Sequence, residues 1–194
     1  MRCWLGRRTG EAALTLRVEA ENCSQANDGY ALRGVGSLME GPGMVVNRTT
    51  GTASVVPELV YEDVGAAVDW LCATFGFTEM WRAGDHRARL SFGNGVVIVA
   101  DADPEYGRDV PGANGPQCHS VMVHVGDADA HHDHARSCGA RILSPPRDYP
   151  YGERQYSAED LGGHQWTFSQ SIADVAPEDW GGTSATPSTA SEAW

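Results

Sequence analysis

The sequence predicts an α+β protein that contains two copies of one βαβββ unit. Two spacings and one repeated order of elements support this prediction. The helix-capping aspartates Asp63 and Asp127 are 64 residues apart, and the helix-ending glycines Gly76 and Gly139 are 63 residues apart. Three strand patterns follow each helical pattern. A duplicated supersecondary unit therefore explains the chain better than one irregular domain does.

The first unit is predicted over residues 54–102. It opens with the strand-like run "SVVPELVYED". A helix follows, because apolar residues recur at helical spacing on one face: Val64, Ala67, Val68, Leu71, Cys72 and Phe75. The runs "FTEMWRAG", "HRARLSF" and "GVVIVAD" supply three strands, and glycine-containing turns separate them as hairpins.

The second unit is predicted over residues 118–170. The run "HSVMVHVGD" forms its first strand, and a helix extends from Ala128 to Cys138. The runs "ARILSPP", "ERQYSAED" and "HQWTFSQ" supply three more strands. The linker "ADPEYGRDVPGANGPQ" between the units is rich in Gly, Pro and Asp, as connecting segments are.

The two ends of the chain differ from this compact part. Residues 1–52 are rich in glycine without a sustained period, and we expect a poorly ordered N-terminal extension. An alternative is a natural start at Met39 or Met44. Residues 173–194 are expected to form a polar C-terminal tail. The predicted domain therefore covers residues 53–172.

Composition excludes several classes of function. The net charge is −12, with 26 acids against 14 bases, which argues against a nucleic-acid partner because phosphate neutralisation needs clustered basic residues. No apolar run approaches the ~20 residues of a membrane span, so no membrane partner is expected. The five cysteines have no metal-site spacing, and reduced thiols in the cytoplasm are the expected state.

The paired units, with "VVPELVYEDVGAAVDWLCATFGF" opening the first and "YGERQYSAEDLGGHQWTF" closing the second, resemble the vicinal oxygen chelate superfamily. This is the glyoxalase, bleomycin-resistance protein and extradiol dioxygenase group, and the likeness is to its glyoxalase-like, bleomycin-resistance-like branch. It covers residues 54–170. The resemblance implies a cup-shaped mixed sheet with helices on the outer face. It also implies a small-molecule ligand in the cup and a homodimer, with the modules paired within a chain or exchanged between chains.

The resemblance also implies where a divalent metal would bind. Metal-dependent members carry ligands on the first and last strands of each unit, and the matching positions are Val56, residues 96–100, Ser120 and Thr167. Valine and the "VVIVA" strand supply no ligand atoms, whereas metal chemistry needs three or four converging groups. His119 would turn inward only with a bulge. We therefore expect no metal cofactor, with a divalent metal as the less favoured alternative.

Strand alternation selects the residues that would line the cup. Gln165 and Thr167 point to one face of the last strand and Trp166 to the other. On the first strand, Glu58 points to the face that the apolar Leu59 does not occupy. The complete set of candidate ligand-binding residues is Glu58, Trp81, Ser120, Met122, His124, Arg154, Tyr156, Gln165 and Thr167.

Each of these candidates has a structural alternative. Glu58 suits an amine or guanidinium ligand, or is an edge carboxylate. Arg154 requires an anion, either from a ligand or from a protein acid. Tyr156, like Tyr151, is a candidate for stacking on a flat ligand. Trp81 lines the rim or belongs to the core. No catalytic residue can be assigned, although His124 has the chemistry of a general base or a ligand contact.

The three helix histidines of "HHDHARS" are a separate cluster. His131 and His134 are one turn apart, so a surface metal pair and a solvated helix face are both open. His131 also fits the apolar stripe between Ala128 and Ala135.

Two functions follow from these observations and the resemblance. The first is a metal-free binding protein that sequesters an antibiotic or metabolite, which requires affinity only. The second is a metal-dependent lyase, isomerase or dioxygenase-like enzyme of the same superfamily, in which the metal acts as a Lewis acid. The two are discriminated by whether oxygen or nitrogen ligands converge with His119 or His124. A domain used only for protein association is a weaker third interpretation.

Overall fold

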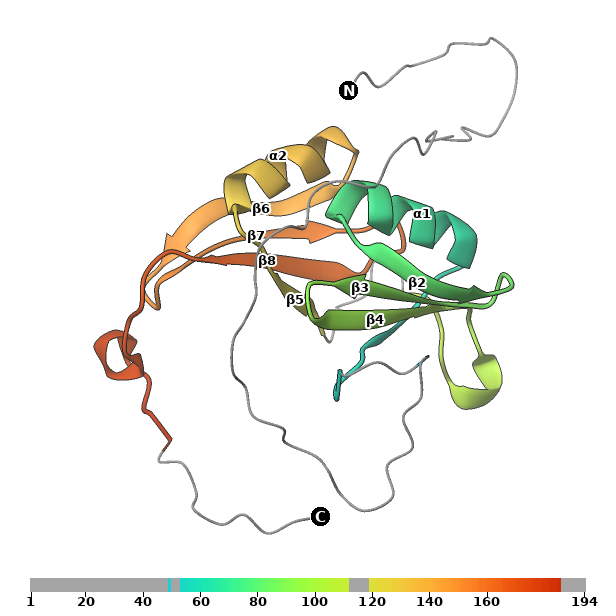
Figure 1. Ribbon diagram of the computed structural model, residues 1–194, viewed down its shortest axis with the longest axis horizontal. Coiled ribbons are helices and arrows are strands. Elements are labelled where there is room, and N and C mark those ends of the chain that lie inside the picture. The colour runs from blue at the N-terminus through green and yellow to red at the C-terminus, as the bar shows by residue number, and fades with distance from the viewer. Residues whose placement is uncertain (1–48, 50–52, 112–118, 186–194) are drawn as a thin grey trace. The chain divides into compact units, whose positions relative to one another are not determined.

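The computed structural model describes residue 49 and residues 53–111 and 119–185 of the 194-residue chain (Figure 1). Apart from Thr49, the predicted N-terminal extension 1–52 lies outside the described residues. So do residues 112–118 of the predicted linker and residues 186–194 of the predicted tail.

The first module has the predicted order β1(Glu58–Val60), α1(Val64–Phe75), β2(Thr78–Ala83), β3(Arg87–Phe92) and β4(Gly95–Ala100). Its strands form one sheet in the order β1-β4-β3-β2. The first and last strands pair in parallel, with Leu59 opposite Val99, and the other pairs are antiparallel. The short 3₁₀ turn η1(Pro104–Tyr106) follows β4.

The second module repeats this arrangement with β5(Val121–His124), α2(Ala128–Ser137), β6(Arg141–Tyr149), β7(Glu153–Glu159) and β8(Gln165–Ser171). The sheet order is β5-β8-β7-β6, and β5 pairs with β8 in parallel. The α+β prediction of two tandem βαβββ modules is therefore confirmed. Both sheets are open mixed sheets.

The two helices begin in the same way, as the spacing of the aspartates predicts. The side chain of Asp63 accepts a hydrogen bond from the Ala66 amide, and that of Asp127 accepts one from the Ala130 amide. Each bond satisfies one of the free amide groups that open a helix. Gly76 ends α1, and Gly139 follows α2 one residue after its C-cap.

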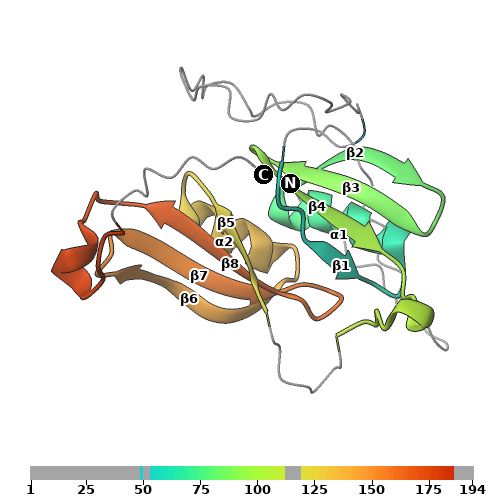
Figure 2. The same ribbon diagram turned by 90° about the horizontal axis from the view of Figure 1, so that it is seen from below.

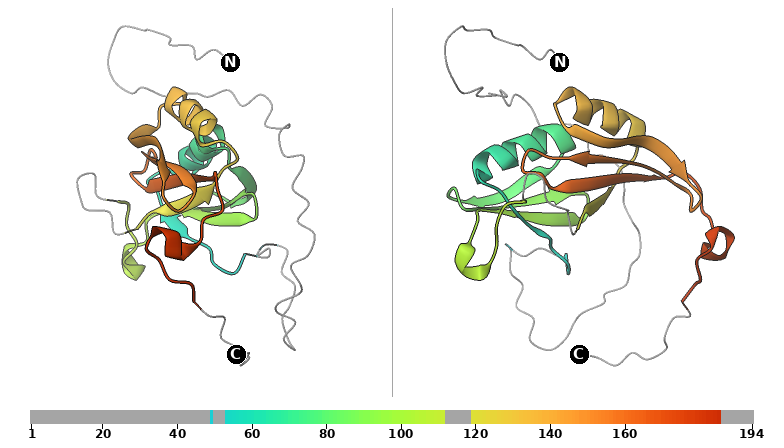
Figure 3. Two further views of the ribbon diagram at one scale, coloured as in Figure 1. Left: turned by 90° about the vertical axis from the view of Figure 1, so that its left-hand side faces the viewer. Right: turned by 180° about the vertical axis from the view of Figure 1, so that it is seen from behind.

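Both helices cover the same side of their sheets, and the view from below shows the opposite, helix-free faces of the strands (Figures 2 and 3). We call these helix-free faces the open faces. Alternate residues of each strand point to the helix side or to the open face. On β8, for example, Trp166 and Phe168 are fully buried on the helix side, which leaves Thr167 and Ser169 on the open face.

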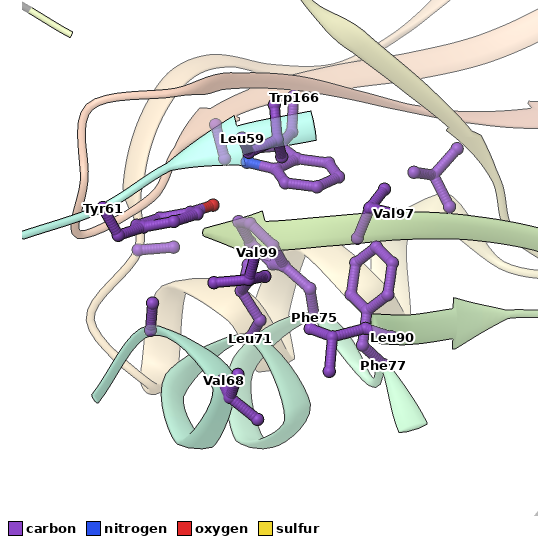
Figure 4. Close-up of a cluster of buried hydrophobic side chains, with 14 of the residues drawn as sticks. Leu59, Tyr61, Val68, Leu71, Phe75, Phe77, Leu90, Val97, Val99 and Trp166 are labelled. Carbon is purple, nitrogen blue, oxygen red and sulfur yellow. The ribbon is translucent and has the colours of Figure 1, made fainter. Parts of the chain in front are cut away.

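One continuous core joins the two modules on the helix side. Trp166 of the second module lies among Leu59, Val97 and Val99 of the first (Figure 4). The ring of Phe75, at the end of α1, lies 4.8 Å from that of Phe168 in an inclined arrangement. Such contacts combine large apolar burial with favourable ring geometry. Burial of these rings therefore holds the modules together.

The predicted polar tail 173–194 begins with a described segment. After β8, residues 172–176 lead into the 3₁₀ turn η2(Pro177–Trp180). Figure 3 shows η2 beyond the end of β8, away from α2. We call residues 172–180 the C-terminal strap.

None of the helices in the described ranges is long and apolar enough to cross a membrane.

Candidate functional site on the open face of the second sheet

The predicted site residues fall into separate places. Met122, His124, Gln165 and Thr167 lie together on the open face of the second sheet, where Met122 is opposite Thr167 and His124 is opposite Ser169. Ser120 is exposed just before β5. The remaining four lie on the first sheet or on the helix side.

Glu58 and Trp81 lie on the open face of the first sheet. The Glu58 carboxylate accepts hydrogen bonds from Arg87 and from Arg108, so its guanidinium partners come from the protein. The indole Nε1 of Trp81 donates to the backbone oxygen of Thr49 at 3.1 Å. Both residues are therefore engaged within the chain.

Arg154 and Tyr156 lie on the helix side of the second sheet, which corrects their assignment to the cup. Arg154 forms ion pairs with Asp129 of α2 and with Asp148 of β6, so its anions are protein acids. Tyr156 is 0% exposed and stacks on Phe168. A fully buried ring cannot contact a ligand in the cup. The physical reason is the register of β7, which turns even-numbered residues toward the helices.

A groove of about 420 Å³ opens on the second sheet beside the C-terminal strap. Strand β5 contributes one side, the β6–β7 turn and the start of β7 form the floor, and the strap forms the other side. The lining residues are Met122, Tyr151, Glu153, Gln155, Val175, Pro177 and Trp180. Its volume lies within the range of small-molecule sites.

Aromatic rings form one wall of the groove. Tyr151 contacts Trp180 of the strap edge-on, with ring centres 5.8 Å apart. On its other side Tyr151 stacks on Tyr149 at 5.1 Å, and the Arg147 guanidinium lies 4.6 Å from the centre of the Tyr149 ring. Met122 and Trp180 remain 54% and 43% exposed, so both can contact a bound molecule.

A hydrogen-bonded carboxylate lies on the floor of the groove. The hydroxyl of Ser169 and the amide Nε2 of Gln155 both donate to Glu153, the second over 2.7 Å. The Gln155 side-chain oxygen accepts a hydrogen bond from the Tyr151 hydroxyl at 3.2 Å. The Ser169 bond, with smaller contributions from Gln155 and the nearby His124, lowers the pKa of Glu153 below its ordinary value. The carboxylate is therefore held in its ionised form.

Gly152 allows the strap to approach this floor. Its φ of +82° is in the left-handed region, and its carbonyl oxygen accepts hydrogen bonds from the amides of Ile172 and Ala173. A Cβ atom at this position would lie 2.3 Å from the Ala173 oxygen. Glycine is thus required both for the turn and for the wall that the strap supplies.

The positions that the resemblance assigns to a metal do not supply a ligand set. Val56 and the apolar residues of β4 have no ligand atoms, and the Thr167 hydroxyl faces that of Ser157 at 3.5 Å. Across residues 53–111 and 119–185, no three His, Cys, Asp or Glu side chains gather as metal ligands would. The side chains present do not fit the metal-dependent pattern, and we derive no chemistry through a metal.

Five groove residues were not among the sequence candidates: Glu153, Gln155, Val175, Pro177 and Trp180. A signal for the first two exists, because Tyr151, Glu153 and Gln155 alternate along one strand face with Arg154 and Tyr156 on the other. Trp180 gives no such signal, since it lies in a segment of polar composition whose contact with Tyr151 depends on the tertiary fold.

The duplicated βαβββ architecture is that of the paired-module proteins that the sequence resembles. Residues 51–168 match the Glyoxalase/Bleomycin resistance protein/Dioxygenase superfamily. The match covers more than half of the chain, and the chain belongs to this family.

Known proteins share sequence or fold with the chain. The chain is similar to TioX from Micromonospora sp. ML1, with 38% identity, coverage of 62% of this chain and 100% of that one, and a TM-score of 0.52. A glyoxalase-related enzyme from Fulvimarina pelagi shares the fold at 17% identity, with coverage of 69% and 99% and a TM-score of 0.53. An uncharacterised protein of Mycobacterium bovis is 26% identical over 127 residues, 61% of this chain and 84% of that protein.

Proposed function

We propose that the chain binds an organic small molecule in the groove on the open face of the second sheet, without a metal, and that it acts by sequestering this molecule. The observation that carries the proposal is the combination of a polar floor with an aromatic wall. Glu153 is fixed by Ser169 and Gln155, and Tyr151 and Trp180 stand beside it. Ligand sites typically pair apolar walls with a few oriented polar groups.

Two further features support binding over turnover. The positions matching the family's metal ligands are occupied by Val56, Ser120, Thr167 and the apolar β4 strand, so Lewis-acid chemistry at those positions lacks its donors. The floor residues also bond to one another, with the Tyr151 hydroxyl and the Ser169 hydroxyl both engaged. Such a preorganised floor favours affinity, because fewer side chains must be ordered on binding.

The proposal is tested by screening aromatic and amine-containing compounds against purified protein whose metal content has been measured by elemental mass spectrometry. Thermal shift identifies binders, and amide chemical shifts locate them. We expect binding at residues 151–155 in metal-free protein and a loss of at least about tenfold for Tyr151→Ala. Tyr106→Ala is the matched control, since Tyr106 is 78% exposed and remote from the groove lining.

A stoichiometric metal in the purified protein, with ligand binding that disappears after chelation, would overturn the proposal. The alternative, a metal-dependent lyase, isomerase or dioxygenase-like enzyme, would then lead. Binding that maps away from the groove would also contradict the proposed site.

The proposal includes the expected homodimer and cytoplasmic location. Exposed apolar side chains such as Leu161 and Ile172 are compatible with a contact between copies, and Cys138 carries a reduced thiol. Light scattering after size-exclusion chromatography tests the dimer: a single species at about twice the 20.8 kDa chain mass is expected.

A further inference from the structure

We propose that the groove selects an organic cation with an aromatic or apolar body, and that Glu153 is its charge-recognition residue. This inference rests on the proposed function, because it names the ligand class of the same groove. It is carried by the carboxylate, the rings beside it and the positions of the chain's guanidinium groups.

The carboxylate of Glu153 has no arginine partner among the described residues. Guanidinium groups on both sheets bind other acids: Glu58 and Glu159, for example, pair with Arg87 and Arg141. Glu153 instead accepts hydrogen bonds from two neutral donors. An ionised carboxylate has about four acceptor positions, so positions remain for a donor that enters the groove. A cationic donor would make the stronger, charge-assisted bond.

The aromatic wall is a second reason to expect a positively charged ligand. Tyr149 already carries the Arg147 guanidinium over its ring, while Tyr151 and Trp180 continue the same row and line the groove together with Glu153. Ring faces attract cations, and the attraction increases when the cation is desolvated. A ligand ammonium group next to Glu153 would therefore meet a carboxylate and ring surfaces together.

The apolar lining determines the rest of the ligand. Met122, Val175 and Pro177 complete the groove without a further charge. A ligand with a flat or apolar body would bury this surface while its cation contacts Glu153. The net charge of −12 also favours the approach of cations over anions.

The test compares three probes of similar size: benzylammonium, benzyl alcohol and benzoate. Each is titrated into the full chain, and binding is measured from the amide shifts of residues 151–155. We expect the cation to bind at least about tenfold more tightly than the alcohol, and benzoate to bind most weakly. Because this series uses the wild-type chain, it does not depend on a variant that folds.

The variant Glu153→Gln should weaken cation binding by about tenfold and so reduce the preference of the groove for the cation over the alcohol. Glu159→Gln is the control, because Glu159 lies on the same strand face outside the groove lining. Equal affinity for the cation and the alcohol would overturn this inference and leave the proposed function standing. Preference for the cation that survives Glu153→Gln would overturn the role of Glu153. Failure of all three probes to shift any groove amide would count against both proposals.

Discussion

The hydroxyl of Tyr61 donates a 2.7 Å hydrogen bond to Oδ2 of Asp160, across 99 residues and between the two modules. The same carboxylate oxygen accepts from the indole Nε1 of Trp166, and Oδ1 accepts from the amides of Gly162 and His164. Burial and the adjacent Asp160 charge raise the pKa of Tyr61, so this phenol stays a donor. Asp160 is thus a buried carboxylate with its hydrogen bonds satisfied.

This relationship gives a physical role to the end of the second module. The "EDLGGHQW" stretch joins β7 to β8 and also binds the first module: the His164 ring nitrogen Nε2 donates to the Val60 carbonyl at 2.8 Å, and Trp166 enters the common core. The hairpin therefore serves two functions. Its turn near Asp160 secures the modules, while its opposite end at Tyr151 and Glu153 forms the groove.

The module contact predicts a stability loss for Tyr61→Phe. The variant keeps the ring but removes one donor from a buried, charged acceptor, and such bonds contribute about 1.5–3 kcal/mol. Urea unfolding should show a loss of about 2 kcal/mol. Tyr106→Phe removes the same atom from an exposed ring and should change stability by less than about 0.5 kcal/mol. Equal effects of the two substitutions would contradict the role of the Tyr61–Asp160 bond.

His131 predicts a specific pH dependence. Its Nε2 donates to the Phe75 carbonyl at 3.1 Å and its Nδ1 accepts from the Tyr156 hydroxyl at 2.5 Å, so the neutral ring is satisfied. Burial, together with repulsion from His134, lowers the pKa of His131. The unfolded chain therefore binds this proton more readily, and stability must fall as the pH drops below about 6.5.

The difference in unfolding free energy between wild type and His131→Gln isolates this contribution from the other histidines. The difference should shrink between about pH 7.5 and pH 5.5, because only the wild type loses stability by protonation of His131. A difference that stays constant or grows would show that His131 is not held neutral between the modules.

Gly152→Ala should disturb the groove more than a turn substitution elsewhere. A side chain with this φ is strained by about 1–2 kcal/mol, and its Cβ would also displace the strap at Ala173. Gly139→Ala provides the control, because Gly139 has a φ of +93° but open space around its Cβ position. We expect both to lose stability, and only Gly152→Ala to change the amide shifts of the strap and weaken probe binding. Equal changes in the strap shifts and in probe binding for both variants would contradict the close approach of the strap to Gly152.

Ser169→Ala should raise the pKa of Glu153 toward its ordinary value, since the Ser169 hydroxyl is the largest cause of its depression. Carboxyl-carbon NMR titration measures this directly. Because the folded pKa is lowered, Glu153 contributes stability above its ordinary pKa, and this contribution is lost as the pH falls through the folded value. Ser157→Ala, on the same sheet face but bonded to Thr167, should leave Glu153 unchanged. If Glu153 titrates at the same pH in both variants, the Ser169 hydroxyl is not the cause of its lowered pKa.

Much of the fold could be predicted because its signals are local. Asp63 and Asp127 cap their helices by accepting hydrogen bonds from amides three residues later in the sequence. The alternation of Trp166 and Phe168 with Thr167 marks the buried face of one strand. The duplication then places the same elements twice. No tertiary information was needed for these steps.

The candidate site was predicted less well, because it depends on register and on segments distant in sequence. Tyr156 and Arg154 were assigned without the pairing of β7 with β8, which puts Tyr156 opposite the buried Phe168. Trp180 enters the groove only because Gly152 lets the strap fold back. Hairpin composition alone does not determine either relationship.

The central claim is metal-free binding of a small molecule at the groove. The most direct test is an NMR titration of chelator-treated, metal-analysed protein with benzylammonium. We predict saturable shifts at Glu153, Gln155 and the Trp180 indole, unchanged when divalent ions are added. Binding that appears only with a divalent ion, or shifts confined to other surfaces, would contradict the account.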